Sequence, residues 1–198
     1  MKSWISKIAT AIAMVVALPI LAHADTWQID PAHTNVEFTV RHMMISNVKG
    51  QFQKTSGTIT VNGNDATSAK IDATIDASSI DTRVERRDAD LKSPNFLDVE
   101  KYPTITFKST KVEAAGPAKW KVTGDLTLHG VTKPLVLDVE GTGAPINDPM
   151  GNTRAGASAT TKIKRSDFGL TWNKVLESGG VMVGDEVAIS IDVEAIKK

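Results

Sequence analysis

Apolar and polar residues alternate over long stretches of the second half of the chain, from Leu126 to Ile196. A period of two puts successive side chains on opposite faces of a strand, so each stretch predicts a strand with one apolar face. The apolar positions are Leu126, Leu128, Leu135, Leu137, Val139, Val187, Ile189, Ile191 and Val193. The simplest closed arrangement is an all-β antiparallel barrel with its apolar face inward, whose interior is either packed or a ligand cavity.

The first half of the chain carries the same pattern. Residues 35–41 place Val36, Phe38 and Val40 on one face, residues 48–61 continue as a long strand or hairpin, and residues 70–77 alternate again. Later, Ala155, Ala157 and Ala159 stand where neighbouring strands carry larger side chains. These small residues leave interior volume, or they mark a tight corner filled by a neighbour's side chain.

The N-terminus has the form of an export signal. Two lysines precede an apolar run over residues 8–21, and Ala22-His23-Ala24 gives the small-x-small pattern of a cleavage site. We expect residues 1–24 to be a signal peptide and residues 25–198 to form one domain.

Composition excludes several classes of function. The chain has 23 basic and 23 acidic residues and no cysteine. Without a positive field, nucleic acid is not an expected partner. Without cysteine, a thiolate nucleophile, an iron–sulfur cluster and a thiolate zinc site are excluded. The histidines after the signal lack HxH or HxxxH spacing, so neither a metal nor another cofactor is expected.

The strand pattern is interrupted between residues 78 and 102. Thr82-Arg83-Val84-Glu85 has the form of a capping box and predicts a short helix from Arg83 to Lys92. Because this helix has few apolar residues, we expect it to lie across a barrel end as a lid. Phe96 and Leu97 follow it and are expected to turn inward as a plug.

Several polar residues have structural explanations. We expect His33 to anchor a turn through Asp30, Arg165 to pair with Asp167 at a strand end, and His129 to support a tight hairpin.

A series of motifs runs along the whole of residues 25–198. They are Trp27-x-Ile29-Asp30-Pro31-x-His33, Val36-x-Phe38-x-Val40-x-His42-Met43, Gly50-x-Phe52, Gly57-x-Ile59, Arg87-Asp88-x-x-Leu91-x-Ser93, Phe96, Tyr102-Pro103, Gly124-x-Leu126-Thr127-x-His129-Gly130-Val131-Thr132-Lys133-Pro134, Arg165-x-Asp167-Phe168-Gly169 and Val183-Gly184-Asp185-Glu186-Val187. With these motifs the chain resembles the YceI family of bacterial periplasmic, lipocalin-like proteins. The resemblance implies an extended eight-stranded antiparallel lipocalin-like barrel in the periplasm, with a long apolar cavity that holds a polyisoprenoid or another long-chain amphiphilic lipid.

The expected ligand-binding residues are inward apolar side chains and a few polar groups near a mouth. They are Phe38, Val40, His42, Phe52, Ile75, Arg87, Asp88, Phe96, Phe107, Leu126, Leu128, Phe168, Trp172 and Ile189. An arginine beside the lid suits a phosphate or carboxylate head group. The alternative is that Arg86 or Arg87 pairs with a nearby acid on a solvated helix.

Three functions are compatible with this pattern. The first is a non-catalytic carrier of a polyisoprenoid, an isoprenoid quinone or a related long-chain amphiphile. The second is an enzyme acting on such a lipid, with His42 and either Asp88 or Asp90 transferring protons, although no local catalytic motif is present. The third is a packed barrel that serves as an interaction module. A barrel that closes incompletely would also expose a strand edge through which a homodimer can form.

Overall fold

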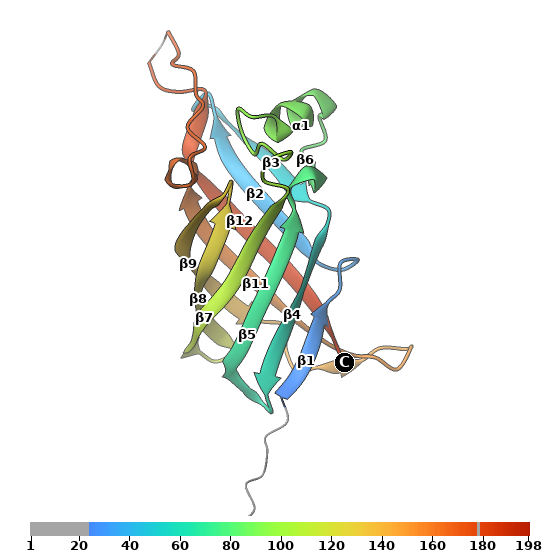
Figure 1. Cartoon of the computed structure of the whole chain (residues 1–198). Helices are drawn as coiled ribbons and strands as arrows, with labels where there is room; N and C mark the ends of the chain where they lie inside the picture. The colour runs from blue at the N-terminus through green and yellow to red at the C-terminus, as the bar shows by residue number, and fades with distance from the viewer. Residues whose placement is uncertain (1–23, 178) are drawn as a thin grey trace, which may run out of the picture.

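The alternating stretches form strands that pair into one closed sheet (Figure 1). The computed structural model describes residues 24–177 and 179–198. The strands are β1 (Ala24–Ile29), β2 (Asn35–His42), β3 (Ser46–Phe52), β4 (Thr55–Asn62), β5 (Asp65–Asp76), β6 (Ile80–Asp81), β7 (Thr104–Gly116), β8 (Lys119–Leu128), β9 (Val131–Gly141), β10 (Ile146–Asn147), β11 (Thr153–Lys164) and β12 (Val183–Lys197). The helical elements are η1 (Ala77–Ser79), α1 (Glu85–Lys92) and η2 (Arg165–Phe168).

The sheet closes because β11 pairs with β12, and every pairing between neighbouring strands is antiparallel. Several walls of the barrel consist of two successive strands. β2 and β1 lie one after the other along the same edge of β12, which they meet at residues 183–192 and 195–197 respectively. β3 and β4 continue this arrangement, followed by β5 and β6. The result is the expected eight-walled barrel: β1/β2, β3/β4, β5/β6, β7, β8, β9, β11 and β12.

The walls are not equally well bonded. β11 and β12 stay in register from Arg154 opposite Ile196 to Lys164 opposite Glu186. β11 and β9 are in register only over residues 157–160. Immediately beyond, the Thr161 hydroxyl donates to the Val136 carbonyl at 2.8 Å in place of a backbone ladder bond.

The predicted apolar face points into the barrel. On β12, Ile189 lies opposite Phe38 of β2, and Ile191 lies opposite Ala159 of β11. Ala159 packs with Val122 and Leu137 in one apolar cluster. A larger cluster fills the end that carries α1, and its buried members are Ala77, Ile80, Leu97, Ile105, Leu126, Leu128, Phe168 and Leu170.

Glycine at position 124 is required by the packing of the inner face. A Cβ on Gly124 would lie 2.4 Å from the ring of Phe107 and 2.5 Å from the carbonyl oxygen of Lys108. The sheet therefore carries a large inward ring beside a position with no side chain.

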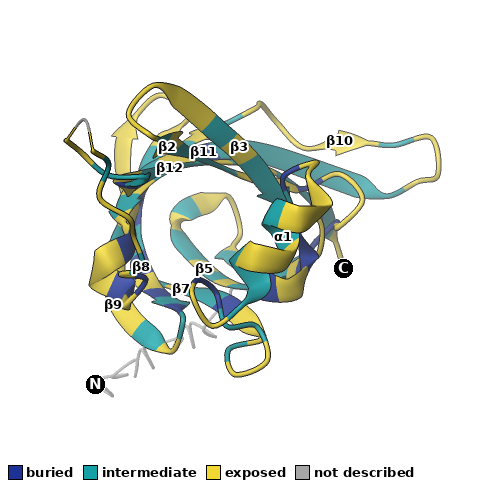
Figure 2. Ribbon diagram, turned by 90° about the horizontal axis from the view of Figure 1, so that it is seen from above, coloured by how far each residue is buried: buried dark blue, intermediate teal, exposed yellow. Residues whose placement is uncertain are grey.

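The predicted helix begins later than expected, at Glu85, and its N-cap residue Val84 makes no side-chain cap bond. The capping-box prediction is wrong because the Thr82 hydroxyl bonds instead to Asp88 and Arg87. α1 lies at the rim of one barrel end, as seen along the barrel in Figure 2. Whether it gates that end stays a prediction.

The predicted signal peptide lies outside the described residues except for Ala24. Ala24 begins β1 and pairs with Asn62 of β4. Within the described ranges, no helix is long and apolar enough to cross a membrane.

Candidate functional site

The walls of the barrel interior are apolar and incompletely covered. Inward-facing side chains on five of the walls, distributed around the barrel, are only half-buried: Phe38, Ile71, Ile75, Phe107, Leu135, Val139, Val187, Ile189, Ile191 and Val193. Among residues 24–177 and 179–198, no large side chain is fully shielded from solvent. Protein interiors are normally packed at crystal-like density. We therefore identify the interior as space that solvent or an apolar ligand can reach.

The end that carries α1 is filled by aromatic and aliphatic side chains. Phe96 is buried, and its ring lies 5.1 Å from that of Trp172, centroid to centroid. Leu97 and Phe168 are buried in the larger apolar cluster described above. The predicted inward turn of Phe96 and Leu97 is therefore confirmed.

The structure sorts the predicted ligand-binding residues into three groups. The first lies on the inward faces of strands and consists of Phe38, Val40, Phe52, Ile75, Phe107, Leu126, Leu128 and Ile189, with His42 at the end of β2 on the same face. The second, Phe96, Phe168 and Trp172, belongs to the filled end. The third, Arg87 and Asp88, lies on α1. Contact between any of them and a ligand stays a prediction.

Arg87 and Asp88 are both bonded to Thr82. The Arg87 Nε donates to the Thr82 hydroxyl at 2.7 Å, and its Nη2 donates to the Thr82 carbonyl at 2.8 Å. The Asp88 Oδ1 accepts from the Thr82 amide at 2.8 Å and from its hydroxyl at 2.5 Å. Thr82 is itself buried. These bonds fasten α1 to the barrel, and they differ from the acid–arginine pairing that was the alternative to a head-group role for Arg87.

Sequence reasoning missed a polar atom in the interior. Thr55 of β4 lies opposite Ile75 of β5, so the two side chains share the inward face. In the part of the chain that the structure describes, the Thr55 Oγ1 is buried and has no hydrogen-bond partner. A lone threonine in an alternating strand gives no sequence signal for such a role.

Sequence reasoning also missed an ionic cluster centred on Arg154 of β11. Its guanidinium donates to Asp30 and Asp148 at 2.6 Å and to Glu194 at 2.5 Å. The predicted His33–Asp30 contact is confirmed, with the His33 Nδ1 lying 2.9 Å from the Asp30 Oδ2.

The charges of this cluster shift the proton affinity of its members. Hydrogen bonds from Arg154 and then from His33 lower the pKa of Asp30 to about 2. The Arg154 bond also holds the pKa of Asp148 well below its usual range.

Asp30, His33 and Glu194 bring three potential metal-ligand atoms within 4.8 Å of one another. The Arg154 guanidinium already supplies the positive charge between the two carboxylates. We therefore assign this cluster a structural role.

The predicted Arg165–Asp167 pair is wrong. Arg165 is buried and donates to two backbone carbonyls, those of Gly184 and Leu170. Carbonyls that are distant in sequence leave no sequence signal. The structural role of His129 is confirmed, since its Nδ1 lies 3.2 Å from the Phe168 carbonyl and its ring lies 4.5 Å from that of Tyr102.

Two depressions lie on the outer wall of the barrel. One, of about 480 Å³, is lined mainly by polar side chains of β2, β9, β11 and β12 that include Glu37, Asp138 and Lys162. The other, of about 380 Å³, is lined by β4, β5 and β7 and includes the Asp72–Lys108 ion pair. Their charged linings suit a long apolar molecule poorly.

Comparison with known proteins agrees with this fold. Residues 27–195 match the family model described as a YceI-like domain. A UPF0312 protein of Vibrio parahaemolyticus is 38% identical over 195 residues, which cover 98% of each chain. The crystal structure of the YceI protein of Campylobacter jejuni has a TM-score of 0.68 and 38% identity, covering 79% of this chain and 89% of that one. The structure of a polyisoprenoid-binding domain from Saccharophagus degradans has a TM-score of 0.63 at 17% identity, covering 87% of this chain and 98% of that one.

Proposed function

Because the chain belongs to the YceI-like family, we propose that it binds a polyisoprenoid, an isoprenoid quinone or a related long-chain amphiphile inside the barrel. The observation that carries this proposal is the set of half-buried apolar side chains on the inward face. The polyisoprenoid-binding domain of similar fold supports the same class of ligand.

The apolar walls suffice energetically for such a ligand. Each buried methylene contributes about 0.8 kcal/mol, so a tail of roughly twenty carbons gains on the order of 16 kcal/mol before the costs of association are subtracted. Selectivity then depends on the few polar atoms near the tail.

We propose binding and not turnover. The alternative enzyme needs Asp88 or Asp90 to exchange protons with His42. The Asp88 carboxylate is bonded to Thr82, and Asp90 lies on the exposed side of α1. A carrier returns its lipid unchanged, and we expect it to act in the periplasm after removal of residues 1–24.

The test is native mass spectrometry with lipid extraction, applied to mature protein purified from the periplasm of a bacterial host. We expect a stoichiometric apolar adduct whose mass does not change on prolonged incubation. Protein that carries no adduct and does not bind added prenyl lipids would favour a packed barrel. Conversion of the lipid to a product would favour the enzyme.

A pair of variants on adjacent residues locates the lipid. Ile191 of β12 faces inward and Ser190 faces outward. Ile191→Asn places an amide in the apolar interior and should reduce adduct formation about tenfold. Ser190→Asn should leave the adduct unchanged. Equal loss in both variants, or in neither, would place the lipid elsewhere.

A further inference from the structure

One end of the barrel exposes a cluster of large apolar side chains outside the interior. Met43, Met44 and Ile45 of the β2–β3 turn and Val175 of the loop before β12 are 38%, 52%, 76% and 77% exposed. We call these four residues the apolar tip. Single exposed apolar residues are ordinary on protein surfaces, but a group of them marks a contact site.

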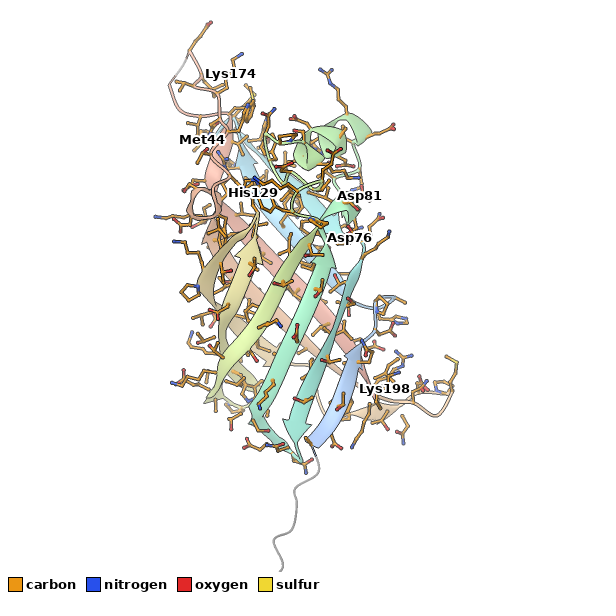
Figure 3. All side chains as sticks on the ribbon, in the orientation of Figure 1. Met44, Asp76, Asp81, His129, Lys174 and Lys198 are labelled. Carbon is orange, nitrogen blue, oxygen red and sulfur yellow. The ribbon has the colours of Figure 1, made fainter. Side chains whose placement is uncertain are left out.

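Backbone bonds hold the two segments of the tip together. The Met43 amide donates to the Met182 carbonyl at 2.7 Å, and the Met182 amide donates to the Lys174 carbonyl at 2.9 Å. Val175 and Val181 form a β-bridge. Figure 3 shows Met44 and Lys174 at the same end of the barrel, which is also the end that carries α1.

The turn adopts a conformation that methionine does not favour. The Ile45 amide donates to the His42 carbonyl at 3.1 Å, and Met43 and Met44 between them have φ angles of 49° and 62°. Positive φ values at both central residues are typical of a type I′ turn, for which Asn-Gly is the preferred pair. Folding alone therefore gives no reason for two exposed methionines here.

A basic side chain adjoins each of the two segments of the apolar tip. The Arg41 Nη2 donates to the Met44 carbonyl at 2.9 Å, and Lys174 immediately precedes Val175. Residues 41–49 contain a second basic residue, Lys49, and no acid, and the loop contributes the acid Glu177. The acids that follow at the start of β12 are already bonded, Asp185 to Ser166 and Glu186 to Lys162. Apolar side chains with basic neighbours complement the surface of an anionic bilayer, where the apolar groups enter the acyl boundary and the basic groups meet the head groups.

We propose that the apolar tip inserts into the surface of an anionic phospholipid bilayer. The loop that carries Val175 also carries Trp172, which packs on Phe96 in the filled end of the barrel. Insertion therefore brings that end of the barrel against a membrane. The purpose of this membrane contact rests on the proposed function, lipid binding. The membrane contact itself is measured separately.

The first experiment is flotation of the mature protein with phosphatidylcholine vesicles, with and without phosphatidylglycerol. We expect flotation with the anionic vesicles only, weakened by added salt. The chain has no cysteine, so Ile45→Cys and Met150→Cys each accept one environment-sensitive dye. The dye at position 45 should shift to shorter emission wavelengths on vesicle binding. The dye at position 150, on an exposed residue of the β10 hairpin, should not.

Two double variants test the tip without unfolding the protein. Met43→Asn with Met44→Gly suits the type I′ turn, so thermal stability should be equal or higher while vesicle binding falls about tenfold. Ile146→Ser with Met150→Ser removes two exposed apolar residues on the β10 hairpin and should leave vesicle binding unchanged.

Three results would overturn the proposal. These are no flotation of the wild type, unchanged flotation of the turn variant, and a concentration-dependent dimer abolished by the turn variant, which would assign the tip to a second copy of the chain. Native mass spectrometry of the turn variant separates the two proposals. If the protein carries a lipid adduct but the wild type does not float with vesicles, only the membrane proposal is rejected. If the wild type floats with vesicles but carries no adduct, only the proposed lipid cargo is rejected.

Discussion

Arg154 joins three segments that are distant in sequence. It bonds to Asp30 after β1, to Asp148 in the β10 hairpin and to Glu194 of β12, and its side chain is 14% exposed. The three carboxylates lie close together only because one guanidinium neutralises them. Removing it would leave like charges at short range in a partly shielded site.

Arg154→Met should therefore lower the midpoint of thermal unfolding at pH 7 by about 6–10 °C. Lys162→Met is the matched control. The Lys162 Nζ lies 2.8 Å from the Glu186 Oε1, and both side chains of this ion pair are largely exposed. The control should stay within about 2 °C of the wild type. Scanning calorimetry of the wild type and the two variants measures these midpoints. Equal midpoints for Arg154→Met and Lys162→Met would contradict the structural role of the Arg154 cluster.

The pH dependence of the same variants follows from the pKa of Asp30, which is lowered to about 2. A lowered folded-state pKa gives stability that is present above the unfolded value of 3.8 and is lost as the pH falls toward 2. In Arg154→Met the neighbouring carboxylates raise one another's pKa, so stability is lost as the pH rises. The variant's deficit should thus be smaller at pH 4 than at pH 7.

At the scale of elements, α1 depends on the bonds between Arg87, Asp88 and Thr82. Arg87→Ala removes two charge-assisted bonds to Thr82 and should cost about 1–2 kcal/mol in the free energy of unfolding. Arg86→Ala, on the exposed side, should cost less than about 0.5 kcal/mol. Urea unfolding measures both. A neutral Arg87→Ala with altered lipid selectivity would instead favour the predicted head-group role.

Element types could be predicted from the sequence because a period of two is a local signal. β2, predicted over residues 35–41, runs from Asn35 to His42, and β5, predicted over residues 70–77, starts earlier and ends at Asp76. The capping-box prediction was wrong because Thr82 bonds to Arg87 and Asp88. The motif specifies residue types but not the hydrogen-bond partner of each side chain. The alternating pattern did not predict the division of walls into β1/β2 and β3/β4 either. That division depends on the pairing of β1 and β2 with β12, and of β4 and β3 with β1 and β2.

At the scale of the whole molecule, alternation predicts which side chains face inward but not how much space lies between them. That volume depends on strand number and stagger, which are set by pairings across the barrel. The resemblance of motifs to the YceI family added the strand number and an expected class of ligand. The Arg154 cluster and the burial of the Thr55 hydroxyl were found only in the structure, because the groups that surround them lie on other strands and loops.

Interior volume itself can be tested on β11. Ala157 lies opposite Val193 and faces inward but is only half-buried, whereas Ala159 is already buried between Val122 and Leu137. Ala157→Leu therefore adds bulk where there is space, and the fold should survive, with unfolding free energy within about 1.5 kcal/mol of the wild type.

The added side chain should compete with a long ligand. We expect Ala157→Leu to weaken uptake of a long prenyl lipid about tenfold while a short prenyl alcohol still binds. Ser158→Leu places the same side chain on the outer face of the same strand and should change neither. Titration of the three proteins with both lipids makes the comparison. Unfolding of Ala157→Leu would show that the space beside Ala157 is already filled. If Ala157→Leu binds both lipids as well as the wild type does, the lipid tail does not reach this wall.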